Sequence, residues 1–285
     1  MTNIKDVAKQ AGVSVATVSR VLSNKPHVRP EIREHVLRIV HESGYRPSRI
    51  ASNMRNQSSR IIGVLVSDIR NPFFTAIARA IEDVAMSQEM SLFLCNTDED
   101  PAKEDLYIKT LLEERVAGVI LSPTKENIDS FDYLFESQIP VVTIDRRIEA
   151  ANIDGVYSDN VSASLLLTNH LIENGFRNIA VLLGLKSSMT GRERMQGYKL
   201  ALQENKIKFN PQFATYVYPS EVAGEASISE WLTSSNRPDA ILTGNSRLTT
   251  GALNAIAAAG LKIPDDIGLA GFDETTWLKH VGPGI

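Results

Sequence analysis

The sequence predicts an all-α helix-turn-helix headpiece followed by an α/β core of two doubly wound lobes. Residues 4–42 carry apolar side chains at helical spacing, interrupted by glycine and proline where tight joints are expected. From residue 61 onward, short apolar segments alternate with amphipathic ones, which is typical of βαβ units and of a parallel sheet covered on both faces. This alternation occurs in two consecutive sets. We therefore expect two lobes with a ligand site in the cleft between them.

Length and composition are those of an ordinary globular protein. The chain has 285 residues, of which 43% are hydrophobic and 22% charged, and domains usually hold about 100–200 residues. No apolar run approaches the roughly 18 residues that a membrane-spanning helix needs, and the N-terminus lacks the apolar segment of a secretory signal. We expect a cytoplasmic protein without membrane contact, whose single cysteine, Cys95, is an inert core thiol.

Charge is distributed unevenly along the chain. Residues 1–60 carry eleven Lys or Arg and four Asp or Glu, which is +7, so the total of −4 leaves −11 for the remainder. A basic N-terminal unit on an acidic body indicates a polyanionic partner, because cationic contacts to phosphate release counterions. A basic face that is merely solvated is the alternative.

Three short helices are predicted in the headpiece. The first covers residues 4–10 and is followed by a turn at Gly12, and Ser14 is a suitable N-cap for the second, which runs to Ser23. Pro30 suits the first position of a third helix that ends before Gly44. The first two helices form a helix-turn-helix.

The second helix is expected to divide its faces between core and DNA. Its apolar residues at positions i, i+3 and i+4 share a face that we assign to the core: Val18, Val21 and Leu22. Its outward residues are two small side chains and, one turn later, a guanidinium: Val15, Ala16 and Arg20. Small side chains can approach a thymine methyl in the major groove, and arginine can form a bidentate pair with guanine. An exposed face with no partner is the alternative.

The core is predicted from short apolar strands. In the first lobe they cover residues 61–66, 91–95, 118–121 and 141–144, with helices beginning near Pro72, Pro101 and Glu126. In the second lobe they lie near residues 155–157, 179–183, 215–218, 240–243 and 268–270. The expected divisions are the headpiece at 1–46, a hinge and linker at 47–60, the N-terminal lobe at 61–148 and the C-terminal lobe at 149–285.

Five motifs resemble the lac repressor (LacI/GalR) family: "IKDVAKQAGVSVATVSRVLS", "GYRPSRIASNMR", "IIGVLVSDIRNPFF", "GRERMQGY" and "AGFDETTW". The resemblance implies a homodimeric transcription regulator, a repressor rather than an enzyme, that binds a palindromic DNA operator. It also implies a small-molecule effector between two lobes similar to periplasmic sugar-binding proteins. The chain ends at "HVGPGI", where the family's chain crosses back to the first lobe, so the resemblance implies a C-terminally incomplete core.

The resemblance assigns a hinge helix within residues 47–54 that enters the minor groove. A helix this short is marginal alone, since isolated helices below about 12–15 residues are unstable. Met54 stands where the family usually has a leucine wedge. Arg29 also differs from the family's pattern, because it precedes Pro30 at the position where relatives carry a capping serine. The full set of expected DNA contacts is Thr2, Lys5, Ser14, Val15, Ala16, Thr17, Ser19, Arg20, Arg29, Arg49, Ser52, Met54 and Arg55.

Effector contacts are expected at the carboxyl ends of core strands. They are Asn71, Phe73, Phe74, Asp145, Arg146, Thr190, Arg194, Asn245, Arg247 and Asp273. For Phe74 the alternative is a core position. Arg247 stands in "GNSRLTTG", where the family commonly has an acid, and with Arg146 and Arg194 it favours a sugar acid such as gluconate over a neutral sugar. The alternative for Arg247 is a solvated helix residue.

The sequence motifs do not indicate an enzyme. No G-x-G-x-x-G follows a predicted strand, which argues against a nicotinamide-dependent oxidoreductase, and "GLKSSMTGRE" lacks the spacing of a phosphate loop. No Ser/His/Asp or metal-ligand constellation appears, so we expect neither cofactor nor metal. A periplasmic binding protein fits the two lobes but neither the helix-turn-helix nor the N-terminus.

Overall fold

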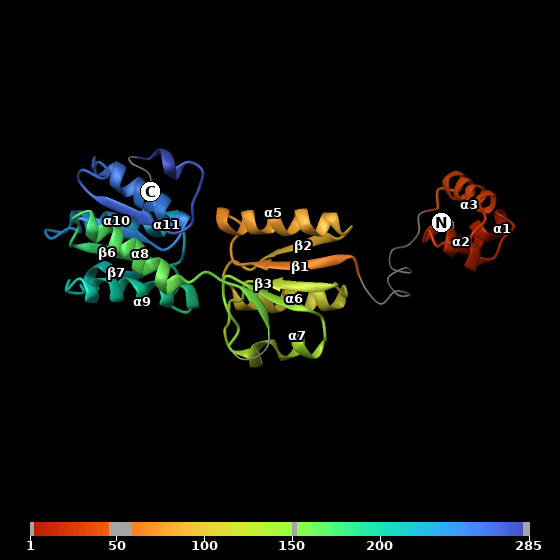
Figure 1. The fold of residues 1–285 in the computed structure, drawn as a ribbon, viewed down its shortest axis with the longest axis horizontal. Coiled ribbons are helices and arrows are strands. Elements are labelled where there is room, and N and C mark those ends of the chain that lie inside the picture. Colours follow the sequence, from red (N-terminus) through yellow and green to blue (C-terminus); the bar gives the residue numbers. More distant parts are fainter. Residues whose placement is uncertain (1–2, 46–58, 150–152, 282–285) are drawn as a thin grey trace. The chain divides into compact units, whose positions relative to one another are not determined.

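The computed structural model describes residues 3–45, 59–149 and 153–281. The chain divides into two compact units, residues 1–59 and residues 60–285. The described residues of the first form three helices and those of the second form two sheets, and Figure 1 shows helices on both faces of each sheet. This confirms the predicted fold class.

The headpiece consists of α1 (Ile4–Gln10), α2 (Val15–Leu22) and α3 (Pro30–Glu42). Helix α1 begins with a capping box, in which the Asn3 side chain accepts from the Lys5 and Asp6 amides and Asp6 accepts from the Asn3 amide. In α2 the Ser14 hydroxyl accepts from the Thr17 amide at 3.1 Å. The three helices enclose one small core around the side chains of Val7, Val18 and Val36, each of which is fully buried.

The N-terminal lobe has one parallel sheet of five strands in the order β2-β1-β3-β4-β5. Its elements are β1 (Ile61–Val66), α5 (Pro72–Ser87), β2 (Ser91–Asn96), α6 (Pro101–Glu113), β3 (Gly118–Leu121), η1 (Ile128–Phe131), α7 (Asp132–Glu136), β4 (Val141–Ile144) and β5 (Asp154–Val156). Helix α5 covers one face of the sheet and α6 and α7 cover the other (Figure 1).

The C-terminal lobe has a parallel sheet of four strands in the order β7-β6-β8-β9. Its elements are α8 (Asn160–Glu173), β6 (Ile179–Leu183), α9 (Met189–Glu204), η2 (Pro211–Phe213), β7 (Ala214–Tyr216), α10 (Glu221–Thr233), β8 (Ala240–Thr243), α11 (Ser246–Ala258), β9 (Gly268–Gly271) and η3 (Leu278–His280). Because helices cover both faces, β6 and β8 are buried along their whole length.

Three sequence-based boundaries need correction. The strand expected to open the second lobe is β5, which pairs in parallel with β4 and so completes the first sheet; the lobe boundary at residue 149 is therefore too early. The helix expected near Glu126 begins as η1 at Ile128, and the strand expected to reach Tyr218 ends at Tyr216. Pairing between strands, which decides β5, leaves no local signal in a three-residue segment.

Candidate DNA-binding surface and ligand cleft

Helix α2 divides its faces as its periodicity predicts. Val18 and Val21 are buried and Leu22 packs partly against the same core. Val15 is 38% exposed, and Ala16 and Arg20 are also exposed. The helix therefore presents two small side chains at its N-terminal end and a guanidinium one turn later.

The remaining residues predicted to contact DNA differ in how exposed their side chains are and in their hydrogen bonds. Lys5 and Arg29 are exposed, and Arg29 makes no side-chain capping bond to α3. The Ser14 hydroxyl is engaged with both the amide and the hydroxyl of Thr17, while Thr17 and Ser19 are half-buried. Thr2, Arg49, Ser52, Met54 and Arg55, together with the proposed hinge helix, lie outside the described residues.

Arg33 supports the loop after α2, a role that sequence reasoning missed. Its guanidinium donates to the Asn24 side chain and to the Lys25 carbonyl, both at 2.7 Å. Asn24 has a φ of +48° and His27 of +75°, so the loop passes twice through the left-handed region, which asparagine and histidine tolerate better than most residues. Arg33 thus ties the end of α2 to α3.

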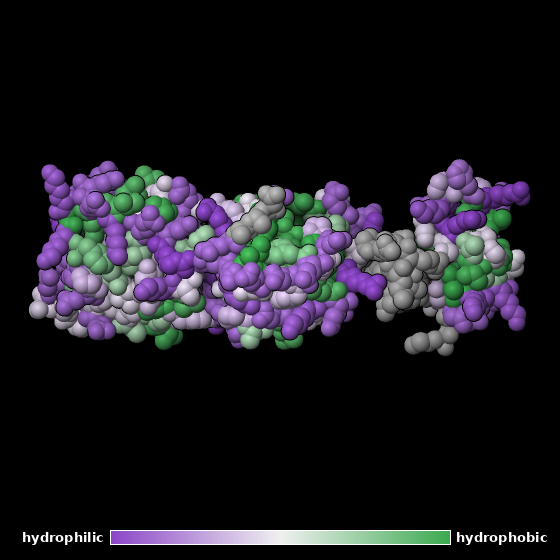
Figure 2. Space-filling view, turned by 90° about the horizontal axis from the view of Figure 1, so that it is seen from below, coloured by the Kyte–Doolittle hydropathy of each residue, from purple (hydrophilic) through white to green (hydrophobic). Residues whose placement is uncertain are grey.

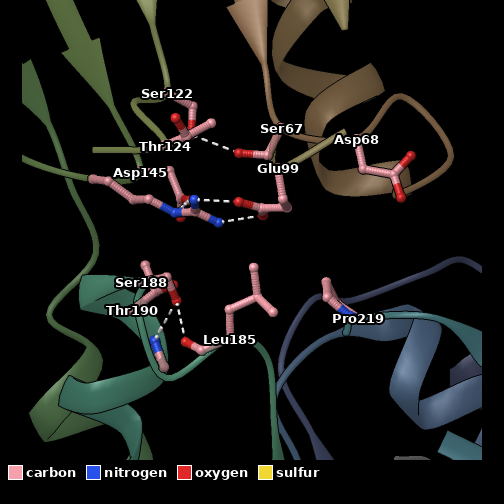
Figure 3. Close-up of polar contacts among 12 residues, drawn as sticks. Ser67, Asp68, Glu99, Ser122, Thr124, Asp145, Leu185, Ser188, Thr190 and Pro219 are labelled. Carbon is pink, nitrogen blue, oxygen red and sulfur yellow. Dashed lines mark hydrogen bonds and ion pairs between the residues drawn. The ribbon is translucent and has the colours of Figure 1, made fainter. Parts of the chain in front are cut away.

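The candidate ligand cleft lies where the strands of the two lobes end. Figure 3 shows polar side chains of the first lobe facing the second lobe across a gap. The labelled residues from the first lobe are Ser67, Asp68, Glu99, Ser122, Thr124 and Asp145; those from the second are Leu185, Ser188, Thr190 and Pro219. Leu185 points towards Glu99. The hydroxyl groups and carboxylates on this wall were largely missed from sequence, because single serines after strands carry no distinctive pattern.

Arg146 is bound within the first lobe by Glu99. Two of its guanidinium nitrogens donate to the two Glu99 oxygens at 2.6 Å each, and both side chains are buried. Asp145 lies 3.5 Å from the Arg146 Nε. Burial disfavours the charge on Arg146, but the bonds to Glu99 outweigh it and raise the pKa of Arg146. Burial raises the pKa of Asp145, and the nearby arginines oppose that rise.

Arg194 is held by the second lobe. Its Nε donates to the Asn160 side chain at 2.8 Å, its Nη1 donates to the Gly244 carbonyl, and its guanidinium stacks on Phe272 at 4.1 Å. Burial lowers the pKa of Arg194, while the charges of Asp273 and Asp145 oppose that effect. Asn160 was not predicted from sequence.

Acidic residues that follow the strands occupy strained backbone conformations. Glu99, Asp145 and Asp273 have φ angles of +58°, +65° and +69°. Each such conformation costs of order 1–3 kcal/mol in a residue other than glycine and is typical of functional sites. These three carboxylates are therefore held in place by the fold around them.

Asn71 and Asn245 both act as helix caps. The Asn71 side chain accepts from the Phe73 amide at 3.0 Å and donates to Asp273 at 3.3 Å. The Asn245 side chain accepts from the Leu248 amide at 2.9 Å. Their carbonyl oxygens are thus engaged, while Asn71 also bridges the two lobes.

The two phenylalanines predicted to contact the ligand, Phe73 and Phe74, pack against apolar residues instead. Phe74 is 5% exposed and belongs to the core cluster of Val64 and Val66, so the core alternative is correct for this residue. Phe73 is half-buried and contacts Phe74 edge to face at 5.1 Å. It lines an apolar hollow along α5 that reaches Asp145 and Tyr157.

Arg247 is not a solvated helix residue, because its side chain is 11% exposed and bonds Asp68 across the lobes at 2.7 Å. The structure therefore places Arg146, Arg194 and Arg247 at the candidate cleft. It also gives each of them a partner. Arg146 and Arg247 pair with carboxylates, whereas Arg194 donates to the neutral Asn160 side chain and to the Gly244 carbonyl. Four carboxylates stand around the three guanidinium groups: those of Asp68, Glu99, Asp145 and Asp273.

Within the described part of the chain, no cluster of His, Cys, Asp or Glu is arranged to hold a metal ion. Among the same residues, no helix has the length and apolar character needed to cross a bilayer.

A helix-turn-helix unit followed in one chain by a two-lobed α/β core defines a DNA-binding transcription regulator. Residues 3–48 match the family described as bacterial regulatory proteins, lacI family, and residues 59–283 match the periplasmic binding proteins and sugar binding domain of LacI family. The chain belongs to the LacI family of transcriptional regulators, and it is a DNA-binding regulator rather than an enzyme.

Three relatives illustrate the similarity. The ribose operon repressor of Halalkalibacterium halodurans is 37% identical over 96% of this chain and 80% of its own length. The regulator KdgR of Bacillus subtilis is 35% identical over 100% of this chain and 85% of its own length. A crystal structure of the lac repressor dimer bound to operator and the anti-inducer ONPF has a TM-score of 0.84 at 27% identity, covering 98% of this chain and 84% of that one.

Proposed function

We propose that this LacI-family regulator represses transcription by binding a palindromic operator as a homodimer, and that a small sugar in the cleft changes its operator affinity. The observation that carries the DNA-binding part is α2, whose exposed Val15, Ala16 and Arg20 face outward from a basic unit. Lys5 and Arg29 suit phosphate contacts, which position the headpiece without reading sequence. The expected contacts in residues 46–58 are part of the same proposal.

A homodimer is supported by exposed apolar side chains on α5 and on the edge strand β2. Val84 and Met86 of α5 are 67% and 71% exposed, and Phe93 and Leu94 of β2 are 39% and 46% exposed. Figure 2, seen from below and so from the side away from α5, shows further hydrophobic residues at the surface of the N-terminal lobe. Exposed apolar side chains and an uncovered edge strand favour association with a second copy.

A neutral sugar is the effector class that the charges of the cleft favour. Serine and threonine hydroxyls, amides and paired charges match the hydroxyl groups of a sugar. A sugar acid, which the sequence favours, would meet four carboxylates, and two of the three guanidinium groups, those of Arg146 and Arg247, are already ion-paired. Arg194 is bonded to neutral groups. The ribose operon repressor at 37% identity is consistent with a neutral sugar.

Sugar binding and operator binding are coupled because the sugar shifts the populations of the lobe arrangements. A sugar that prefers one arrangement of the lobes raises the population of that arrangement and so changes operator affinity by a coupling free energy. The test of the effector is thermal unfolding with ribose, glucose, gluconate and 2-keto-3-deoxygluconate, because a ligand that binds the folded state raises the unfolding midpoint.

Selection of bound sequences from random duplex DNA tests the operator. An inverted repeat is expected, and recovery of unrelated sequences contradicts the proposal.

A further inference from the structure

Asp68 and Arg247 join the two lobes through a buried ion pair. Asp68 follows β1 and Arg247 is the second residue of α11, and 179 residues separate them. The Arg247 Nη1 donates to the Asp68 Oδ2 at 2.7 Å and to the Pro219 carbonyl at 3.1 Å. The side chains are 6% and 11% exposed, so solvent screens this pair much less than a surface pair.

Neighbouring contacts hold Asp68 in position. Arg70 donates through its amide and Nε to the Asp68 Oδ1, both at 2.9 Å, and through Nη2 to Oδ2 at 3.1 Å. These bonds raise the pKa of Arg70. Because Arg70 anchors the carboxylate within its own loop, Asp68 is presented to the second lobe in a fixed orientation.

Contacts of Asn71 extend the same link between the lobes. The Ser246 hydroxyl donates to the Asn71 side chain at 3.1 Å, and Asn71 donates to Asp273 at 3.3 Å. Arg70 also approaches the Tyr218 hydroxyl at 3.4 Å. One four-residue loop, residues 68–71, therefore contacts three separate segments of the C-terminal lobe.

Arg247 has bonding capacity that its present partners do not use. Its Nε is buried and makes no hydrogen bond within the described residues. Asp68 and Pro219 lie at one end of the gap seen in Figure 3. If Asp68 lost its charge, an unpaired guanidinium would face this end of the cleft, where it would attract an anion.

We propose that the Asp68–Arg247 pair is a specificity determinant of the effector site: it holds the lobes together and keeps the Arg247 guanidinium engaged, so that the cleft accepts a neutral polyhydroxylated ligand and rejects a carboxylate. This inference rests on the proposed role of the cleft in sugar binding.

The test compares the full chain with the variants Asp68→Asn, Arg247→Gln and the double variant, and uses Arg79→Gln as a control that removes an exposed arginine from α5. Titration with D-gluconate follows the shift of the unfolding midpoint. We expect Asp68→Asn to bind gluconate at least tenfold more tightly than the unaltered chain does. The double variant should lose this gain, and the control should behave like the unaltered chain.

Closure of the lobes is measured separately by small-angle X-ray scattering without ligand. We expect a larger radius of gyration for Arg247→Gln and for Asp68→Asn than for the control. Gluconate affinity that is unchanged in Asp68→Asn, or raised equally in the double variant, overturns the charge role; equal radii overturn the closure role. If the unaltered chain binds no sugar while Asp68→Asn gains gluconate, the sugar effector is wrong and the charge role stands.

Discussion

Arg146 and Glu99 form a two-bond ion pair inside the wall of the candidate ligand cleft. Each bond measures 2.6 Å, and the side chains are 8% and 7% exposed. Planar guanidinium and carboxylate groups match each other in this geometry. The pair therefore fixes the orientation of Arg146 and balances its charge before any ligand arrives.

Removal of Arg146 alone should destabilise the core. Arg146→Ala leaves Glu99 buried without its cation, and we expect a loss of about 3–5 kcal/mol in the free energy of unfolding. The double variant Arg146→Met/Glu99→Leu should recover most of that loss but bind no sugar. Urea unfolding and ligand-induced midpoint shifts measure the two effects. Equal instability of the single and double variants would contradict this explanation.

Arg20 should read the operator sequence. Arg20→Ala is expected to weaken operator binding by about 1–3 kcal/mol and to leave binding to random duplex nearly unchanged, because a contact to a base edge is lost and phosphate contacts are kept. Fluorescence anisotropy at fixed salt measures both affinities. Arg38→Ala, which removes an exposed arginine from α3, serves as the control. Equal losses on both DNAs would assign Arg20 to phosphate.

Gly251 should be intolerant of a side chain, because α10 and α11 pack in close contact there. A Cβ at this position would lie 2.3 Å from the Glu221 carbonyl oxygen and 2.6 Å from the Glu225 amide nitrogen. Gly251→Ala should therefore cost about 1–3 kcal/mol of stability through overpacking. Gly118→Ala, whose Cβ meets its nearest atom at 3.4 Å, is the matched control. Similar midpoints for the two variants would be inconsistent with tight helix packing.

Glu104 should make stability depend on pH. Its carboxylate is fully buried, and burial raises its pKa although the Thr124 amide and hydroxyl donate to it at 2.7 and 2.8 Å. The folded chain thus holds the proton more tightly than the unfolded chain. The contribution to stability is complete below the ordinary glutamate pKa of about 4.3 and is lost as pH rises through the raised value.

Glu104→Gln removes this titration. We expect its free energy of unfolding to rise relative to the unaltered chain as pH increases above about 4, on top of a constant offset from the altered hydrogen bonds. Denaturant unfolding at several pH values provides the measurement. Glu136→Gln at an exposed position controls for the general loss of a charge. Parallel stability curves for Glu104→Gln and the unaltered chain would refute the prediction.

Much of the fold and of the recognition helix was predictable from sequence. The period of Val18, Val21 and Leu22 identified the buried face of α2, and runs such as residues 179–183 identified buried strands. These features are local, because the side-chain period and the capping residues lie within one element. The strand near residues 155–157 was predicted, but the sheet to which it belongs was not, since that depends on the pairing of β5 with β4.

The sequence by itself determined the elements, the family and the polar residues that follow the strands. Only the tertiary structure decided which charges meet, because Arg146 and Glu99 lie 47 residues apart and Asp68 and Arg247 lie 179 apart. Sequence reasoning counted three arginines near the cleft and inferred an acidic ligand. The fold supplies carboxylate partners for Arg146 and Arg247, so the charge that is left for a ligand depends on the pairing of buried groups and not on the number of arginines alone.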